Sequence, residues 1–199
     1  MRMGILGGTF DPIHNAHLMI AGEALKQLGL DEVIFIPTYH TPLKEDDIIT
    51  PVEHRVRMLE LALTGNPAFR MSRIEIDRAG ISYTVDTIAG LKQSLGDDSE
   101  LYFITGLDSL ETLTRWKEPD RMIRMCRLVT VRRPGYDVPA INELEKVIPG
   151  ITESLIILDG LAPDISATNV RERVAAGLSI IDLVPAVVEK YIKQNRLYT

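Results

Sequence analysis

The chain has 199 residues, of which 45% are hydrophobic and 25% charged, and it contains a single cysteine. This composition is typical of a globular protein and excludes a disordered chain, an intrachain disulfide and a cysteine-rich zinc site. A net charge of −6 argues against a protein that coats nucleic acid, and the absence of a long apolar run or a signal peptide predicts a cytoplasmic enzyme or binding protein.

Short apolar runs alternate with helical patterns along the chain. The runs at 3–6, 33–36, 101–104, 128–131 and 155–158 predict β-strands, and the alternating stretch 69–76 predicts another. Helical spacing predicts helices at 15–28, from Pro51 to 63, and at 85–95, 141–147, 170–176 and 186–193. Strands that are apolar on both faces favour a doubly wound parallel α/β sheet. We expect one domain over residues 1–199, with the last helices packed on it.

Ligands of such sheets bind beyond the carboxyl ends of the strands. The loop after the first predicted strand reads GGTFDPIHNAH over residues 7–17, and its two glycines allow the backbone to approach a ligand closely. His14 and His17 lie three residues apart at the start of a helix, so both rings can project to one side and donate hydrogen bonds to phosphate. A zinc-binding pair and two ordinary surface histidines are the alternatives.

Basic residues gather between 115 and 133 although the whole chain is acidic. This segment holds seven basic and two acidic residues, a local charge of +5. It is either a solvated helix face or a field that attracts an anionic small molecule. Arg132 and Arg133 directly follow a predicted strand, so we expect this pair at the carboxyl edge of the sheet.

The loop GGTFDPIHNAH resembles the signature of the HxGH nucleotidyltransferases. Further segments, spread in order over essentially the whole chain, resemble bacterial nicotinate-nucleotide adenylyltransferases: DEVIFIP (31–37) followed by Lys44, ISYTVDT (81–87), FITGLDSLETLTRW (103–116), VRRPG (131–135) and ISATNVRER (165–173). The resemblance implies a Rossmann-like fold and transfer of the adenylyl group of ATP to nicotinate mononucleotide in NAD biosynthesis. The mononucleotide phosphate would attack in line, without a covalent intermediate, and Mg²⁺ would be carried by the ATP phosphates.

The resemblance also implies which residues bind each substrate. The ATP contacts would be Gly8, Thr9, Phe10, His14, His17, Gly106, Asp108, Ser166, Thr168 and Arg171. The nicotinate mononucleotide contacts would be Thr9, Lys44, Tyr83, Thr84, Trp116 and Arg133. The catalytic residues would be His14, His17, Lys44 and Arg171.

Structural roles remain open for some of these residues. Hydroxyl side chains such as Ser166 cap a helix by accepting backbone N–H groups, and Asn169 with Glu172 fits a capping box. Asp108 can serve as a helix N-cap. A lone tryptophan is more often a core residue than a ligand platform, although Trp116 stands among charged residues.

Two positions depart from the family pattern: Ala16 replaces the glycine between the histidines, and Leu43 stands where relatives commonly have histidine. A phosphopantetheine adenylyltransferase and a non-catalytic nucleotide-binding sensor are the rival functions, and an interaction scaffold would leave the polar residues after the strands unexplained. We expect no nucleic-acid or membrane partner. The sequence leaves open whether the chain forms a homodimer.

Overall fold

The computed structural model describes residues 1–41, 49–96, 98–131, 141–160 and 163–199. Its centre is a six-stranded parallel sheet with the order β3-β2-β1-β4-β5-β6. The strands are β1 (Arg2–Gly8), β2 (Glu32–Pro37), β3 (Phe69–Met71), β4 (Glu100–Thr105), β5 (Arg127–Val131) and β6 (Leu155–Leu158). Because β1 pairs with β2 on one side and β4 on the other, the direction of winding reverses between β1 and β4, where such folds bind ligands.

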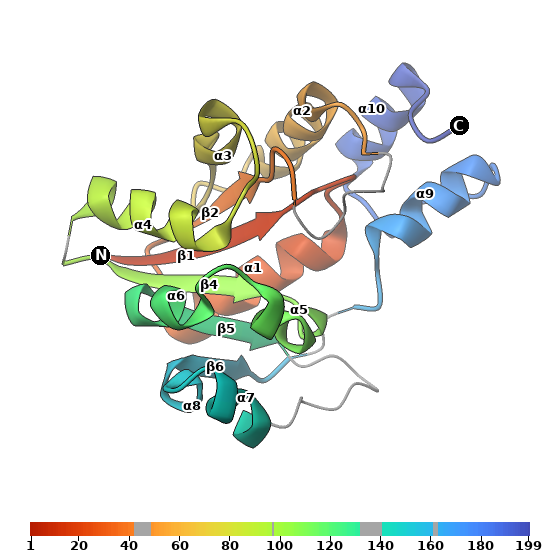
Figure 1. Cartoon of the computed structure of the whole chain (residues 1–199). Helices are drawn as coiled ribbons and strands as arrows, with labels where there is room; N and C mark the ends of the chain where they lie inside the picture. The colour runs from red at the N-terminus through yellow and green to blue at the C-terminus, as the bar shows by residue number, and fades with distance from the viewer. Residues whose placement is uncertain (42–48, 97, 132–140, 161–162) are drawn as a thin grey trace.

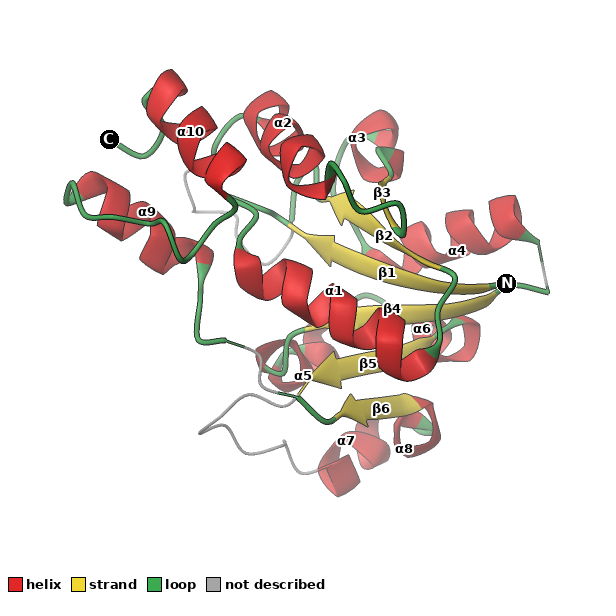
Figure 2. Cartoon of the chain, turned by 180° about the vertical axis from the view of Figure 1, so that it is seen from behind, coloured by secondary structure: helices red, strands yellow, loops and turns green. Residues whose placement is uncertain are grey.

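Helices cover both faces of this sheet. They are α1 (Asn15–Leu28), α2 (Val52–Leu63), α3 (Ile74–Arg78), α4 (Thr84–Leu95), α5 (Asp108–Glu111), α6 (Pro119–Met125), α7 (Ile141–Val147), α8 (Ile151–Ser154), α9 (Ala167–Ala175) and α10 (Ala186–Asn195), with a 3₁₀ turn η1 (Leu113–Arg115). Figure 1 shows α4 to α8 in front of the sheet, and Figure 2, seen from the opposite side, shows α1, α2 and α10 covering the other face. The predicted doubly wound α/β fold is confirmed.

Each central strand is buried on both faces. Met3 and Ile5 of β1 pack in the cluster that contains α4 and α6, whereas Leu6 packs in the cluster that contains α1 and α2. Successive side chains of a strand point to opposite faces, so a strand covered on both sides must be apolar throughout. Val188 of α10 and Val170 of α9 are buried in the same cluster as Leu6, which confirms that the last helices pack on this sheet.

The strand predicted at 69–76 is wrong beyond its first residues. β3 ends at Met71, and α3 begins at Ile74. The alternation of apolar and polar residues continues past the strand, but Glu75 turns inward, is only 6% exposed and accepts a hydrogen bond of 2.7 Å from the Thr87 hydroxyl on α4. This tertiary contact overrides the local pattern. The pattern also missed α6, and it missed α5 and α8, which have four residues each and are too short to show a helical period.

Within the described ranges, every helix is too short or too polar to cross a lipid bilayer.

Glu75 provides a test of this buried contact through the pH dependence of stability. Burial raises the pKa of Glu75 above 4.5, more than its hydrogen bond from Thr87 lowers it. Between pH 4.5 and the raised pKa, the folded state binds more protons than the unfolded state, so this carboxyl group stabilises the fold at low pH and that contribution is lost as pH rises. We expect the Tm of Glu75→Gln, relative to wild type, to rise as pH increases above 4.5 and to level off once pH passes the raised pKa of Glu75.

The control is the same substitution at Glu111, an exposed residue at the end of α5. Its Tm difference from wild type should change little over this pH range. If the Glu75→Gln difference is equally flat, burial does not control the protonation of Glu75.

Candidate active site

The loop after β1 places Thr9 and Phe10 at the carboxyl edge of the sheet. Phe10 is only 2% exposed and its ring meets that of His17 edge to face, with 5.0 Å between the ring centroids. Its φ of 49° lies in the left-handed region that non-glycine residues rarely adopt, so surrounding contacts must hold it there. A Cβ atom at Gly8 would lie 3.1 Å from the Phe10 ring. Glycine therefore leaves room for this ring, and Phe10 offers a ligand its main chain only.

His14 and His17 lie together at the start of α1. His14 is the N-cap of the helix, and its backbone N–H donates to Nδ1 of His17 over 3.3 Å. The two rings stack with 3.7 Å between their centroids and 26° between their planes. The expectation that both rings share one side of the helix start is confirmed.

The environment of His17 keeps it neutral. Burial, together with the charge of His14 when that ring is protonated, lowers the pKa of His17 well below 6.5. Because Nδ1 accepts the His14 N–H, the single proton of the neutral ring lies on Nε2. His17 therefore holds an N–H donor at the far edge of its ring. Ala16 between the two histidines is 4% exposed, so its methyl group is packed inside the protein and not presented to a ligand.

Arg55 on α2 supports the loop and was missed from the sequence. It is 2% exposed, and its guanidinium donates to the carbonyl oxygens of Thr9 at 2.7 Å and Thr38 at 2.8 Å. One feature of the sequence could have predicted its burial. Arg55 lies one turn before Leu59, so both residues are on the face of α2 that packs against the core. A buried arginine at such a position satisfies carbonyl groups that have left the β-ladder.

The segment that begins α9 meets the same loop. Ser166 is the N-cap of α9, and its hydroxyl accepts the Asn169 N–H at 3.1 Å. The predicted capping box of Asn169 with Glu172 is therefore wrong, because the helix begins earlier. Arg171 donates to the Asp11 carbonyl oxygen at 2.8 Å. The loop after β1 and the start of α9 thus come together, although 160 positions separate Asp11 from Arg171.

A pocket of about 520 Å³ opens beside this loop. Of the predicted residues, it is lined by Gly8, Thr9, Tyr83, Thr84 and Trp116. The Trp116 ring is half-buried and meets Phe103 edge to face at 5.9 Å, so it is both packed against the core and open to the pocket. Tyr83 and Thr84 begin α4, where the first backbone N–H groups of a helix lack partners within the helix. The pocket therefore combines an aromatic wall with N–H groups suited to an anion.

Two interpretations of the basic segment 115–133, a solvated helix face and a source of cations for an anionic ligand, each hold for part of it. Arg115 and Lys117 line the pocket, and the Lys117 ammonium lies 4.6 Å from the centre of the Tyr83 ring. Three ion pairs of the same segment join Lys117 to Asp86, Arg121 to Glu118 and Arg124 to Asp120. Part of the segment is thus a solvated helix face, and part supplies cations to the pocket.

Some predicted residues lie outside the described ranges, namely Lys44, Leu43, Arg132 and Arg133. Gly106 directly follows β4 and is exposed, with open space where a side chain would stand. The backbone of Asp108 begins α5, and the N-cap is Leu107, so the prediction of Asp108 as N-cap is wrong. Among the described residues, no group of three or more His, Cys, Asp or Glu side chains is placed to hold a metal ion.

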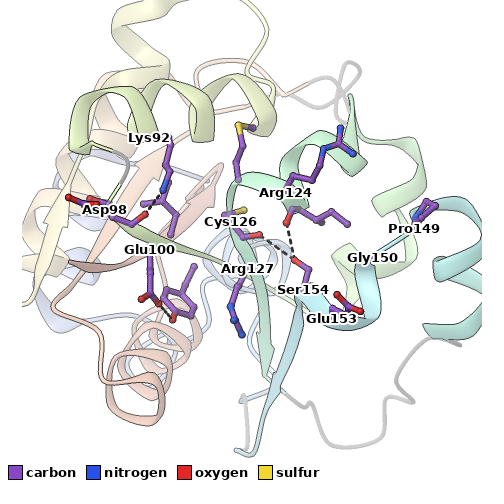
Figure 3. Close-up of a pocket in the computed structure, with 15 residues that line it drawn as sticks. Lys92, Asp98, Glu100, Arg124, Cys126, Arg127, Pro149, Gly150, Glu153 and Ser154 are labelled. Atoms are coloured by element: carbon purple, nitrogen blue, oxygen red, sulfur yellow. Dashed lines mark hydrogen bonds between the residues drawn. The ribbon is translucent and has the colours of Figure 1, made fainter.

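A second pocket, of about 610 Å³, lies at the opposite end of the sheet, where β4 and β5 begin (Figure 3). Ser154 and Lys92, two of its polar side chains, are hydrogen-bonded to backbone carbonyl groups. The Ser154 hydroxyl donates to the carbonyl groups of Ile123 and Cys126, and Lys92 donates to the Ser99 carbonyl oxygen at 2.6 Å. Burial raises the pKa of Cys126 to about 12, so its thiol stays protonated at neutral pH and is a poor nucleophile. The pocket at the carboxyl end is therefore the candidate active site.

The chain is similar to known proteins over most or all of its length. A family model described as cytidylyltransferase-like matches residues 5–173. A probable nicotinate-nucleotide adenylyltransferase from Dehalococcoides mccartyi is 49% identical, covering 100% of this chain and 97% of the relative. A probable nicotinate-nucleotide adenylyltransferase from Roseiflexus is 46% identical, covering 98% of this chain and 97% of the relative.

The fold has a similar structural match. The nicotinic acid mononucleotide adenylyltransferase of Plasmodium falciparum, solved in complex with NaAD, aligns with a TM-score of 0.80 at 19% identity, covering 99% of this chain and 97% of that one. Identity over the full length of the bacterial relatives confirms the resemblance seen in the sequence motifs. The chain is a nucleotidyltransferase and belongs to the nicotinate-nucleotide adenylyltransferase family of cytidylyltransferase-like proteins.

Proposed function

We propose that this enzyme transfers the adenylyl group of ATP to nicotinate mononucleotide, giving deamido-NAD and pyrophosphate. The main support is the pocket at the end of β1, where an aromatic wall and the start of α4 lie beside the loop that carries the paired histidines. Residues 1–199 act in this proposal as one domain, in the cytoplasm. We propose no nucleic-acid or membrane partner.

The reaction needs positioning more than it needs a base. An oxygen of the mononucleotide phosphate attacks the α-phosphorus of ATP, and the bond from that phosphorus to the bridging oxygen of pyrophosphate breaks. The phosphate is already ionised at neutral pH, so no side chain has to remove a proton. The enzyme aligns the two phosphates and stabilises the charge that spreads over the transferring group. Mg²⁺ arrives with ATP as part of the substrate, and no cage of protein ligands is required for it.

The ATP phosphates bind at the two motifs that meet around the loop after β1. The Nε2–H of His17 donates to the α-phosphate, and His14 lies beside it. Ser166, Thr168 and Arg171 bind the β- and γ-phosphates from the start of α9. The main chain of Gly8, Thr9 and Phe10 follows the phosphates, and Gly106 with Asp108 binds the ribose.

Nicotinate mononucleotide occupies the pocket. Its pyridine ring stacks on Trp116, and its carboxylate accepts from the N–H groups of Tyr83 and Thr84 at the start of α4. Thr9, Lys44 and Arg133 contact its phosphate. Arg115 and Lys117, which line the pocket, make it attractive to this doubly anionic ligand.

The direct test is to mix the protein with ATP, Mg²⁺ and nicotinate mononucleotide, its amide or phosphopantetheine, and to follow pyrophosphate. We expect the highest kcat/KM with the acid, because N–H donors cannot bond to the NH₂ of the amide. No release with either pyridine mononucleotide would disprove the proposed function. Release with phosphopantetheine alone would establish the rival enzyme.

His17 can be tested with a matched pair of variants. His17→Ala removes the donor at Nε2, so kcat should fall on the order of 10²- to 10³-fold. His17→Gln returns an amide N–H near the Nε2 position and should recover part of this loss, whereas the shorter His17→Asn should not. Equal kcat for wild type and His17→Ala, measured by pyrophosphate release, would exclude the phosphate contact.

Trp116 is tested by comparing the KM values of the two substrates. Stacking on an aromatic side chain contributes about 1–3 kcal/mol, so Trp116→Ala should raise the KM for nicotinate mononucleotide roughly 5- to 150-fold and leave the KM for ATP nearly unchanged. Trp116→Phe keeps an aromatic face and is the control for lost packing on Phe103. A similar rise in both KM values would show that Trp116 supports the fold instead of the pyridine ring.

A further inference from the structure

Asp11, in the loop after β1, connects three parts of the chain that are distant in sequence. It is only 4% exposed. One carboxylate oxygen accepts the Thr50 N–H at 3.0 Å, and the other accepts the Tyr198 hydroxyl at 2.7 Å. Its backbone carbonyl accepts from Arg171 at 2.8 Å. The two carboxylate oxygens of Asp11 therefore bind the segment before α2 and the segment after α10, and its carbonyl oxygen binds α9.

The loop depends on such external contacts. Phe10 has a φ of 49°, a conformation that an isolated loop would leave, and Asp11 follows it directly. His14 lies three residues further on and caps α1. A shift of Asp11 would therefore be passed along a short, buried stretch of backbone to the two histidine rings.

Tyr198 reaches Asp11 from the segment after α10. That helix ends at Arg196 in a left-handed conformation, and the Leu197 N–H returns to the Ile192 carbonyl oxygen at 3.1 Å, which turns the chain back toward the core. The Tyr198 ring packs against the core cluster that contains Phe10. Burial and the neighbouring Asp11 carboxylate raise the pKa of Tyr198, so its hydroxyl keeps its proton and donates. α2, α9 and α10 gather at this end of β1 in Figures 1 and 2.

We propose that Tyr198 is a positioning residue for adenylyl transfer: its hydrogen bond to Asp11 holds residues 9–14 in the conformation that aims His14 and His17 at the ATP phosphates. Tyr198 touches neither substrate. The inference rests on the proposed function, because its catalytic consequence is read through that reaction. The simpler interpretation is that the bond only fastens the end of the described chain to the core.

The chain offers a matched control for this distinction. Tyr191 is also half-buried and belongs to α10, and its hydroxyl is hydrogen-bonded to Nδ1 of His54 on α2 at 2.9 Å. Tyr191→Phe therefore removes one hydroxyl and one hydrogen bond from the same part of the fold without touching the loop. Tyr198→Phe removes the corresponding bond to Asp11. Both substitutions keep the aromatic ring and its packing.

The experiment compares wild type and both variants in Tm, in steady-state kinetics with ATP and nicotinate mononucleotide, and in amide hydrogen exchange of residues 9–17. We expect a larger loss of Tm for Tyr198→Phe than for Tyr191→Phe, because it leaves a buried carboxylate oxygen of Asp11 without its donor. We expect Tyr198→Phe alone to lower kcat by about 5- to 100-fold, with a smaller change in either KM, because misplaced groups cost most in the transition state. We also expect faster exchange of residues 9–17 in Tyr198→Phe alone.

Equal kcat and equal loop exchange for the two variants would overturn the proposal and leave a purely structural bond. Faster exchange with unchanged kcat would also overturn it, since the loop would then be held without effect on the reaction. If wild type releases no pyrophosphate with nicotinate mononucleotide, the proposed function fails. In that case the comparison of amide exchange still decides whether Tyr198 holds residues 9–14 in place. The proposed effect of Tyr198 on kcat would be disproved together with the proposed function.

Discussion

One buried cation holds together the part of the molecule where the strands end. Arg55 donates to the carbonyl oxygens of Thr9 and Thr38, which follow the neighbouring strands β1 and β2, and its Nε donates to Thr50 just before its own helix. The Thr9 and Thr38 carbonyl groups lie just past the ends of their strands, where the β-ladder no longer supplies donors. A single planar guanidinium satisfies all three carbonyl groups. The ends of β1 and β2 and the start of α2 are thereby fixed as one unit, and the site is built on that unit.

Much of the fold could be predicted because hydrophobicity and topology are tightly linked in a parallel sheet. A strand such as β1 is covered on both faces, so its apolar run is a direct consequence of its place in the sheet. β3 is different, because it is a three-residue strand at the edge. There the alternation of 69–76 reflects the half-buried edge strand first and the half-buried helix α3 afterwards. Two different structures share one pattern, and tertiary contacts such as the bond from Thr87 to Glu75 distinguish them.

The residues at the strand ends could be predicted, whereas the bonds that aim them could not. Carboxyl ends of parallel strands meet at one edge, so the sequence predicts a ligand site at the loop after β1. The bond from Tyr198 to Asp11 spans 187 positions, and that from Arg55 to Thr9 spans 46. No local spacing encodes such pairs. A buried arginine on the apolar face of a helix indicates that hydrogen-bond acceptors lie near its guanidinium, but the sequence does not identify those acceptors.

The proposed phosphate site separates hydrogen bonding from charge. The stacked rings of His14 and His17 lie too close to hold two positive charges cheaply, and the pKa of His17 is well below 6.5. A neutral imidazole is nevertheless sufficient for a directed N–H, because its tautomer is fixed by the bond that Nδ1 accepts. Positive charge comes instead from Arg171 and from Arg55 behind the loop, which cannot lose their protons. In this proposal the α-phosphate of ATP accepts a hydrogen bond from the neutral His17 ring, and the arginines supply the positive charge around it. The net charge of −6 for the whole chain therefore says little about the electrostatic field at this site.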